Sequence, residues 1–193
     1  GIDPAPGDTV RFKRGNVIRD VLRTRKGAEG APITYAAYGE GDKPTFLGSV
    51  AVDDPACWVE ESASIWRYTE TLPSEVCNLI FNNGESCGNL RYALEDLQQP
   101  GEWHYTCVGA TSAGDRWNGP DPRNASLYLR SPVNPAEAYR SIECALWGRR
   151  ELVKGASHVL LEGLSFRNSG VHGYHSVHAQ DVVIRDCDFR FIG

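Results

Sequence analysis

Two stretches near the C-terminus match each other at an offset of 23 residues: His158–Gly170, HVLLEGLSFRNSG, and Asp181–Gly193, DVVIRDCDFRFIG. The offset superposes residues of the same kind: Val159 on Val182, Leu161 on Ile184, Leu164 on Cys187, Phe166 on Phe189, Arg167 on Arg190 and Gly170 on Gly193. Within each copy the apolar residues alternate with others, as they do in strands with one buried face. A phase slip at Glu162–Gly163 predicts a corner where the chain turns onto a second short strand.

The same offset fits the N-terminal region, where it places Val10 over Ile33 and Phe12 over Tyr35. A period in the low twenties, with no helical pattern between the copies, predicts a parallel β-helix whose coils stack about 4.8 Å apart. A leucine-rich repeat has a similar period, but its L-x-x-L-x-L-x-x-N pattern is missing. An antiparallel sandwich would show hairpin turn signals in the two end regions of the chain, but these regions contain no such signals.

The middle of the chain, residues 40–156, breaks this period and is rich in Trp, Pro and Gly. We expect first coils at 1–39, a loop- and hairpin-rich elaboration at 40–156 and further coils at 157–193. The elaboration contains five expected short strands, at residues 44–48, 64–68, 76–81, 102–106 and 126–130. A brief helix is expected at Leu90–Gln98 and a turn at Pro135–Tyr139. The elaboration either shapes a binding face or caps the end of the β-helix.

The composition bounds the class of protein. The chain has 193 residues, 41% of them hydrophobic, a formal net charge of −5 and no Met. These values are ordinary for one soluble globular domain, and no apolar run approaches the roughly 20 residues of a membrane span. Binders of nucleic acid are usually basic, so we expect neither a nucleic-acid nor a membrane partner. The first four residues resemble the remnant of an expression tag, and we leave them out of fold reasoning.

Six cysteines are too sparse for a disulfide scaffold, and no C-x-x-C pair suggests a metal or redox motif. Cys144 and Cys187 fall in apolar strand patterns and are expected to be buried thiols. The pairing of the other four stays open: Cys57, Cys77, Cys87 and Cys107. A single glycosylation sequon stands at residues 124–126.

The residues also carry a family resemblance. Gly7–Gly15, GDTVRFKRG, and Ala31–Gly39, APITYAAYG, resemble the first coils of right-handed parallel β-helix proteins of the pectate-lyase-like superfamily. Pro100–Tyr105 and Leu127–Pro135 look like the hairpin insert of bacterial members related to β-helix glycoside hydrolases. Residues 171–174 and 183–188 resemble the coils that follow in these proteins. The resemblance implies an all-β, right-handed parallel β-helix and an action on polysaccharide or oligosaccharide.

Members of that superfamily usually begin with a capping strand and helix and continue for many coils. The resemblance therefore implies a fragment of a larger enzyme, or a naturally short relative. We expect part of a polysaccharide-degrading or -modifying enzyme, with glycoside hydrolysis slightly ahead of elimination, and a secreted or periplasmic location. The alternatives are a non-catalytic module that binds glycan or protein, and an inactive truncated piece.

Outward side chains of successive coils form rows, and the 23-residue register pairs Glu162 with Arg185 as a cross-strand ion pair. It also stacks Arg167 on Arg190, and two stacked guanidinium groups would suit the carboxylate of an acidic sugar. Either the arginines bind such a ligand, or they splay apart or pair with Asp188. We take Arg167, Arg190, Arg185 and Trp103 as candidate substrate-binding residues.

His172, His175 and His178 form an H-x-x-H-x-x-H run. Positions three apart in a strand point to opposite faces, so we expect no shared metal, and no cofactor is predicted. His172 is the candidate acid or base, with a hydrogen bond inside a turn as its structural alternative. Asp186 and Asp188 are candidate catalytic carboxylates of the kind that glycosidases pair. A set of aromatic residues either stacks on sugar rings or packs an irregular domain: Trp58, Trp66, Trp103, Tyr105 and Trp117.

Overall fold

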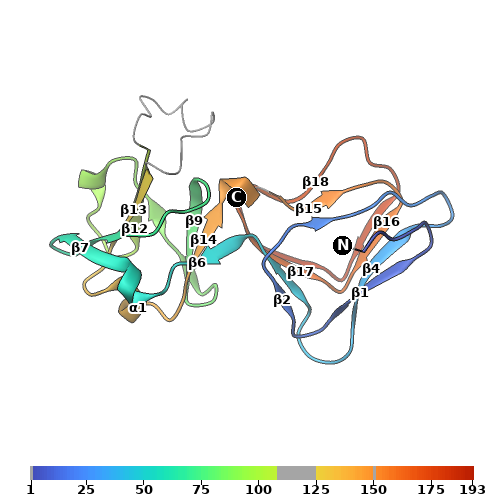
Figure 1. Ribbon diagram of the computed structural model, residues 1–193, viewed down its shortest axis with the longest axis horizontal. Helices are drawn as coiled ribbons and strands as arrows, with labels where there is room; N and C mark the ends of the chain where they lie inside the picture. The colour runs from blue at the N-terminus through green and yellow to red at the C-terminus, as the bar shows by residue number, and fades with distance from the viewer. Residues whose placement is uncertain (1, 108–124, 150) are drawn as a thin grey trace. The chain divides into compact units, whose positions relative to one another are not determined.

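The computed structural model describes residues 2–107, 125–149 and 151–193 (Figure 1). The chain divides into two compact units. Unit 1 is formed by residues 1–48 together with 149–193, and unit 2 by residues 49–148. The fold is all-β, and unit 2 lies inside the middle region that the sequence sets apart. In the described part of the chain, no helix is long and apolar enough to span a membrane.

Unit 1 consists of three sheets in which every strand pair is parallel. Sheet A has the order β1 (Thr9–Lys13), β4 (Ile33–Tyr38), β16 (Val159–Glu162), β19 (Val182–Arg185). Sheet B has the order β2 (Val17–Ile18), β5 (Thr45–Leu47), β17 (Ser165–Ser169), β20 (Asp188–Ile192). Sheet C has the order β3 (Leu22–Arg23), β15 (Glu151–Gly155), β18 (His172–Ser176).

The chain visits these sheets in the same sequence each time, A then B then C, and we name one such passage a winding. Figure 1 shows β1, β4 and β16 on one side of the unit, β2 and β17 on another, and β15 and β18 on the third. Unit 2 is inserted in the second winding, because the chain leaves unit 1 after β5 and returns in β15.

The 23-residue register near the C-terminus is confirmed. Val159 lies beside Val182, Phe166 beside Phe189, and Arg167 beside Arg190. The backbone conformation repeats as well. Three corner residues of the third winding have positive φ, and so do the residues 23 positions later in the sequence. These pairs are His158 and Asp181 (54° and 51°), Gly163 and Asp186 (69° and 50°), and Asn168 and Phe191 (62° and 53°). Gly, Asn and Asp tolerate this conformation best, which explains most of these corner residues.

The N-terminal register differs from the prediction. Val10 lies beside Tyr35 and Phe12 beside Ala37, so the first winding is 25 residues long on sheet A and the offset of 23 was wrong there. The lengths of all three connections cause the difference. Between aligned positions, the steps from sheet A to B, B to C and C to A take 7, 5 and 13 residues in the first winding, and 4, 9 and 10 in the third. An error of two residues preserves which side chains face inward, because the side-chain period of a strand is two.

The core of unit 1 contains a stack of phenylalanine rings contributed by sheet B and β1. Phe46 and Phe166 have ring centroids 5.3 Å apart, and Phe166 and Phe189 5.0 Å, both stacked. Phe12 meets Phe46 edge-on at 5.1 Å. Offset and edge-on ring pairs add stabilisation beyond the burial of apolar area.

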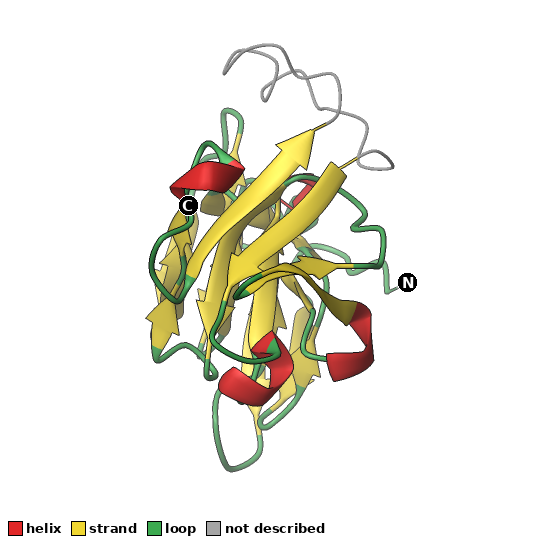
Figure 2. Ribbon diagram, turned by 90° about the vertical axis from the view of Figure 1, so that its left-hand side faces the viewer, coloured by secondary structure: helices red, strands yellow, loops and turns green. Residues whose placement is uncertain are grey.

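Unit 2 contains two sheets whose side chains share one hydrophobic core (Figure 2). The first is antiparallel, with the order β10 (Ser86–Cys87), β9 (Val76–Phe81), β14 (Ile142–Leu146), β6 (Ser49–Ala51). The second has the order β11 (Asn89–Leu90), β12 (Glu102–Cys107), β13 (Ala125–Arg130), β8 (Ile65–Tyr68), β7 (Trp58–Ser62), and only β11 and β12 pair in parallel. All five strands predicted between residues 44 and 130 are present, the first as β5 of unit 1 and the rest here.

Short helices complete unit 2: η1 (Pro55–Cys57), η2 (Leu94–Asp96), η5 (Trp147–Arg149) and α1 (Pro135–Ala138). The turn predicted at Pro135–Tyr139 is confirmed as α1. The helix predicted at Leu90–Gln98 was wrong except for the single 3-10 turn η2. Leu90 pairs instead with Trp103 as a strand, and the Glu102 side chain takes up backbone N–H groups that a helix would use.

Candidate functional site

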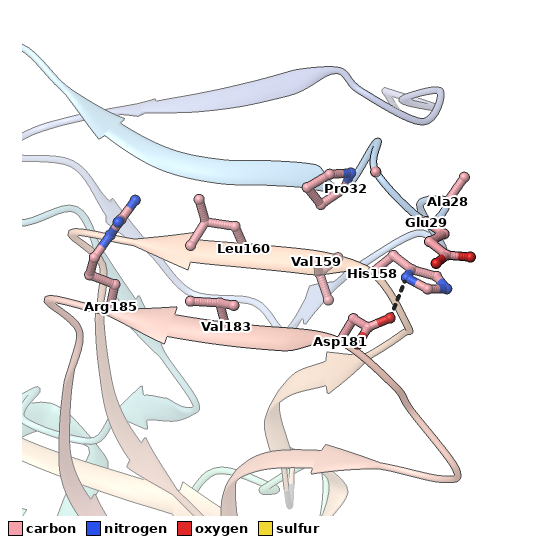
Figure 3. Close-up of a pocket in the computed structure, with 10 residues that line it drawn as sticks. Ala28, Glu29, Pro32, His158, Val159, Leu160, Asp181, Val183 and Arg185 are labelled. Carbon is pink, nitrogen blue, oxygen red and sulfur yellow. Dashed lines mark ion pairs between the residues drawn. The ribbon is translucent and has the colours of Figure 1, made fainter.

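An open pocket of about 500 Å³ lies on the outer face of sheet A, and we call it the sheet A pocket (Figure 3). Its lining comes from the segment between β3 and β4 and from strands β16 and β19. The residues that line it include Glu29, Pro32, His158, Leu160, Asp181, Val183 and Arg185.

Strand alternation builds the floor of this pocket. Val159 and Leu161 are buried in the core at 1% and 0% exposed, so Leu160 between them points outward. Leu160 and Val183 are direct neighbours on β16 and β19, and Val183 is 51% exposed. Figure 3 shows both side chains on the same side of the sheet, with Pro32 nearby. The result is an aliphatic floor that is open to solvent.

One end of the floor carries a histidine paired with a carboxylate. Nδ1 of His158 lies 3.0 Å from Oδ2 of Asp181, and Figure 3 shows Glu29 beside them. The His158 side chain is mostly buried, at 16% exposed, whereas that of Asp181 is 71% exposed. A carboxylate on Nδ1 orients the ring and leaves Nε2 as the nitrogen that can form a hydrogen bond with a ligand.

Sequence reasoning missed His158 as a candidate site residue, although the signal was present. The 23-residue repeat lays His158 over Asp181, and the structure confirms that the backbone N–H of Val159 donates to the Asp181 carbonyl at 3.2 Å. The repeat therefore predicts that His158 and Asp181 lie side by side in neighbouring windings, just as it predicts this for Glu162 and Arg185.

The other end of the floor carries the ion pair that the sequence predicts. Nε of Arg185 lies 2.9 Å from Oε1 of Glu162, across β16 and β19. Both side chains are exposed, at 61% and 41%, so the pair contributes little stability. Arg185 lines the pocket and can donate hydrogen bonds to a ligand there.

A second polar cluster occupies the corner between sheets A and B, and we call it the corner cluster: Arg14, Lys43, Asp186 and Asp188. Nζ of Lys43 lies 2.8 Å from Oδ1 of Asp186 and 3.5 Å from Oδ2 of Asp188. Lys43 therefore joins the two candidate catalytic carboxylates. Arg14 adds a favourable charge for Asp186.

Gly163 makes room for this cluster. It occupies the same corner as Asp186, one winding earlier, and has a φ of 69°. A Cβ at Gly163 would lie 3.3 Å from Cβ of Ala37 and 3.7 Å from Nη2 of Arg14. Lys43, which belongs to the second winding, reaches Asp186 in the fourth across a corner that has no side chain.

Lys43 stabilises the ionised form of Asp186. Its hydrogen bond to Asp186, and then its charge, lower the pKa of that carboxyl below the ordinary value. In return the hydrogen bond to Asp186 raises the pKa of Lys43. Asp186 is therefore ionised at neutral pH, which suits a base, a nucleophile or a hydrogen-bond acceptor and works against a role as general acid.

His172 belongs to sheet C, so the structure places it on a different sheet from Asp186 and Asp188. Its backbone carbonyl accepts a hydrogen bond of 2.6 Å from the Ser169 hydroxyl, and its side chain is exposed. The rings of His172 and His175 stack at 5.7 Å, so the prediction that these two point to opposite faces was wrong. Gly173, between them in the sequence, packs closely against the core, since a Cβ there would lie 2.5 Å from the Phe189 ring. Among the residues described, no group of three or more His, Cys, Asp or Glu side chains is arranged to hold a metal ion.

The remaining candidate substrate-binding residues lie elsewhere. Arg167 and Arg190 are neighbours on β17 and β20, as predicted, and Nε of Arg167 donates to the Ser165 hydroxyl at 3.2 Å. Trp103 is 1% exposed in the core of unit 2. A ring with no exposed face cannot stack on a sugar, so the substrate-binding role predicted for Trp103 was wrong.

The other aromatic candidates also pack the core of unit 2. Trp58 is 3% exposed and donates from Nε1 to the Val52 carbonyl at 2.8 Å. Trp66 donates to the Ser131 carbonyl at 3.1 Å, and Tyr105 packs against the same core. Trp117 and the sequon residue Asn124 lie outside the described residues.

The described cysteines differ in burial. Cys144 is fully buried, as predicted, and burial raises the pKa of its thiol well above the ordinary value. Cys187 is only partly buried, and burial raises its pKa too. Cys57 and Cys87 have free thiols, and the side chain of Cys107 lies outside the described residues.

Comparison with known proteins gives a likeness of fold. No protein-family model matches the chain, and no curated protein does. The solved structure of XylC in complex with xylose matches with a TM-score of 0.61 at 15% identity, over 87% of this chain and 31% of that one. A structure described as a glycoside hydrolase gives a TM-score of 0.49 at 10% identity, over 86% of this chain and 44% of that one. The chain thus spans about a third of the length of XylC and less than half of the other protein.

Proposed function

We propose that this chain is part of a carbohydrate-active protein built on a right-handed parallel β-helix, and that the sheet A pocket binds a sugar residue. The β-helix is supported by three parallel sheets visited in the same order and by the 23-residue register of the last windings. The right hand is supported by the rule that crossovers between parallel strands are right-handed in about 98% of cases.

The observation that carries the sugar proposal is the make-up of the sheet A pocket. Leu160 and Val183 form an apolar floor, and polar groups stand at both ends, with His158 and Asp181 at one and Arg185 at the other. A sugar ring has an apolar face of C–H groups and an edge of hydroxyl groups, so it matches such a floor and such ends. XylC, which shares the fold at low identity, has been solved with a bound sugar, and this supports the same ligand class here.

Hydrolysis is favoured over elimination as the reaction of the whole protein. Elimination removes a proton that a neighbouring carboxyl group of the sugar makes acidic, and xylose has no carboxyl group. Hydrolysis by paired carboxylates needs one ionised group and one that stays protonated. In the corner cluster Asp186 supplies the ionised group, and Lys43 links it to Asp188, the second candidate carboxyl group.

The second candidate function is that of a non-catalytic sugar-binding module. The corner cluster also supports this function. Lys43 contacts both carboxylates, so a cation of the protein itself offsets part of their negative charge. Carboxylates held in this way can serve as structure rather than as catalysts. The two candidates share the sheet A pocket as the place where sugar binds.

The experiment combines a binding and a product measurement on the full chain. Affinity electrophoresis in gels containing xylan or polygalacturonate measures binding, while new reducing ends report hydrolysis and ultraviolet absorbance reports elimination. We expect retardation by xylan that is lost in Val183→Asp and kept in Val17→Asp, a matched control because Val17 is also exposed, at 61%, on β2. Retardation that is unchanged in Val183→Asp, or absent for both polysaccharides, would overturn the proposal.

A further inference from the structure

Unit 2 has a pocket of its own, of about 570 Å³, beside strands β11 and β12. Polar and aromatic side chains line it: Arg91, Tyr92, Asp96, Gln98, Gln99 and Glu102. We call it the β12 pocket. All of its lining residues belong to unit 2, so it is a different site from the sheet A pocket.

A buried carboxylate fixes the shape of the β12 pocket. Glu102 is 3% exposed, and its Oε2 accepts hydrogen bonds from the backbone N–H groups of Gln98 and Gln99 at 2.5 Å and 2.8 Å. Its Oε1 accepts from Nε of Arg91 at 3.0 Å. Both ends of the segment 91–99 are thereby tied to one side chain on β12. A ligand would meet groups that are already in place, which lowers the entropy lost on binding.

The groups around this anchor match the surface of a sugar. Tyr92 is 77% exposed and offers an aromatic side chain to solvent at the pocket. Sugar hydroxyls both donate and accept hydrogen bonds, and the amides of Gln98 and Gln99 do so as well. Aromatic side chains bind the C–H faces of ligands through their large, rigid apolar area.

The charge of the β12 pocket selects the kind of sugar. Glu102 neutralises Arg91, because their side chains form an ion pair at 2.5 Å. Asp96 is then the charge that remains among the lining residues, and it repels an anionic ligand. The pocket is therefore suited to a neutral sugar and poorly suited to a uronate or a phosphate.

We propose that the β12 pocket is a second sugar-binding site, specific for a neutral sugar residue and independent of the sheet A pocket. The choice of sugar as ligand class rests in part on the proposed function. The two sites are made of different residues in different units, so each can fail without the other.

The test is an amide NMR titration of the full chain with xylohexaose, cellohexaose and mannohexaose, and with hexagalacturonate as the charged comparison. We expect at least one neutral oligosaccharide to shift the amides of residues 91–99. We also expect Tyr92→Ala to weaken that binding about tenfold, and hexagalacturonate to bind at least tenfold more weakly. Tyr38→Ala is the matched control, because Tyr38 is also exposed, at 46%, but lies on β4 of unit 1. Gln99→Ala gives a second variant that keeps the anchor Glu102.

The outcomes separate this inference from the proposed function. Shifts at residues 91–99 that weaken in Tyr92→Ala and not in Tyr38→Ala support the second site, whatever happens in unit 1. Shifts confined to β16 and β19 overturn the second site and leave the proposed function standing. The second site is also overturned if the shifts at residues 91–99 are the same in Tyr92→Ala as in the wild type, or if hexagalacturonate causes stronger shifts than the neutral oligosaccharides do. It is overturned as well if no neutral oligosaccharide shifts the amides of residues 91–99.

Discussion

Replacing Phe166 with Ala should destabilise unit 1 more than the same truncation of its stacked neighbour Phe189. Phe166 is 0% exposed and lies between two rings, Phe46 at 5.3 Å and Phe189 at 5.0 Å. Truncating a fully buried Phe to Ala costs about 3–5 kcal/mol, because the apolar contact is lost and a cavity remains. Two stacked ring pairs are lost with it, each worth about 0.5–1.5 kcal/mol beyond burial.

Two matched variants separate these effects. Phe166→Leu keeps most of the volume and loses only the ring pairs, so we expect a cost of about 1–3 kcal/mol. Phe189→Ala removes a ring that is only partly buried and has one stacked neighbour, so we expect about 2 kcal/mol. The predicted order is therefore Phe166→Ala first, with the other two clearly smaller.

The assay must report on unit 1 alone. All five tryptophans of the sequence fall between residues 58 and 147, within unit 2, so tryptophan fluorescence does not follow unit 1. Hydrogen exchange of the amides in β16 and β17, measured by mass spectrometry at increasing urea, does follow it. Equal costs for Phe166→Ala and Phe189→Ala, or a cost below about 1 kcal/mol for the first, would refute the stacking of rings described here.

Three further predictions concern single side chains. Gly163→Ala should cost about 1–2 kcal/mol because the Cβ of alanine is strained at a φ of 69°. An unchanged urea midpoint for unit 1 would count against this corner. Glu102 has a pKa of about 2, lowered from 4.5 first by its hydrogen bond to Arg91 and then by backbone N–H groups. It therefore stabilises unit 2 above pH 4.5 and loses that effect as pH falls towards 2, and the acid sensitivity of tryptophan fluorescence should be reduced in Glu102→Gln. Lys43→Met should raise the pKa of Asp186 towards its ordinary value, which carboxyl ¹³C NMR measures, and an unmoved titration would show that Lys43 does not hold that carboxylate.

The fold of unit 1 was predictable where its windings are regular. Val159, Leu161 and Phe166 each have a residue of the same kind 23 positions later in the sequence. Strand alternation then decides which side chains face inward. The N-terminal register was not predictable in the same way, because it depends on the lengths of the connections between strands. Phe12 over Tyr35 and Phe12 over Ala37 are equally good apolar pairs by pattern, and only the summed lengths of the connections in the first winding decide between them.

The candidate site was predictable in part, for a related reason. Arg185 and Glu162 could be paired because both lie in the regular repeat, and His158 with Asp181 could have been found by the same step. Lys43 could not, since it reaches Asp186 across an intervening winding. Trp103 was misassigned because composition cannot tell an indole in a core from one at a surface.

The most direct test of the proposed sugar site is whether a sugar touches its floor. With the methyl groups of Leu160 and Val183 labelled, nuclear Overhauser effects to the ring protons of xylohexaose measure that contact. The proposal predicts such effects to both methyl groups in the wild type and their loss in His158→Ala or Arg185→Ala, which remove the polar ends of the pocket. Saturating xylohexaose that leaves both methyl groups without any Overhauser effect would contradict it.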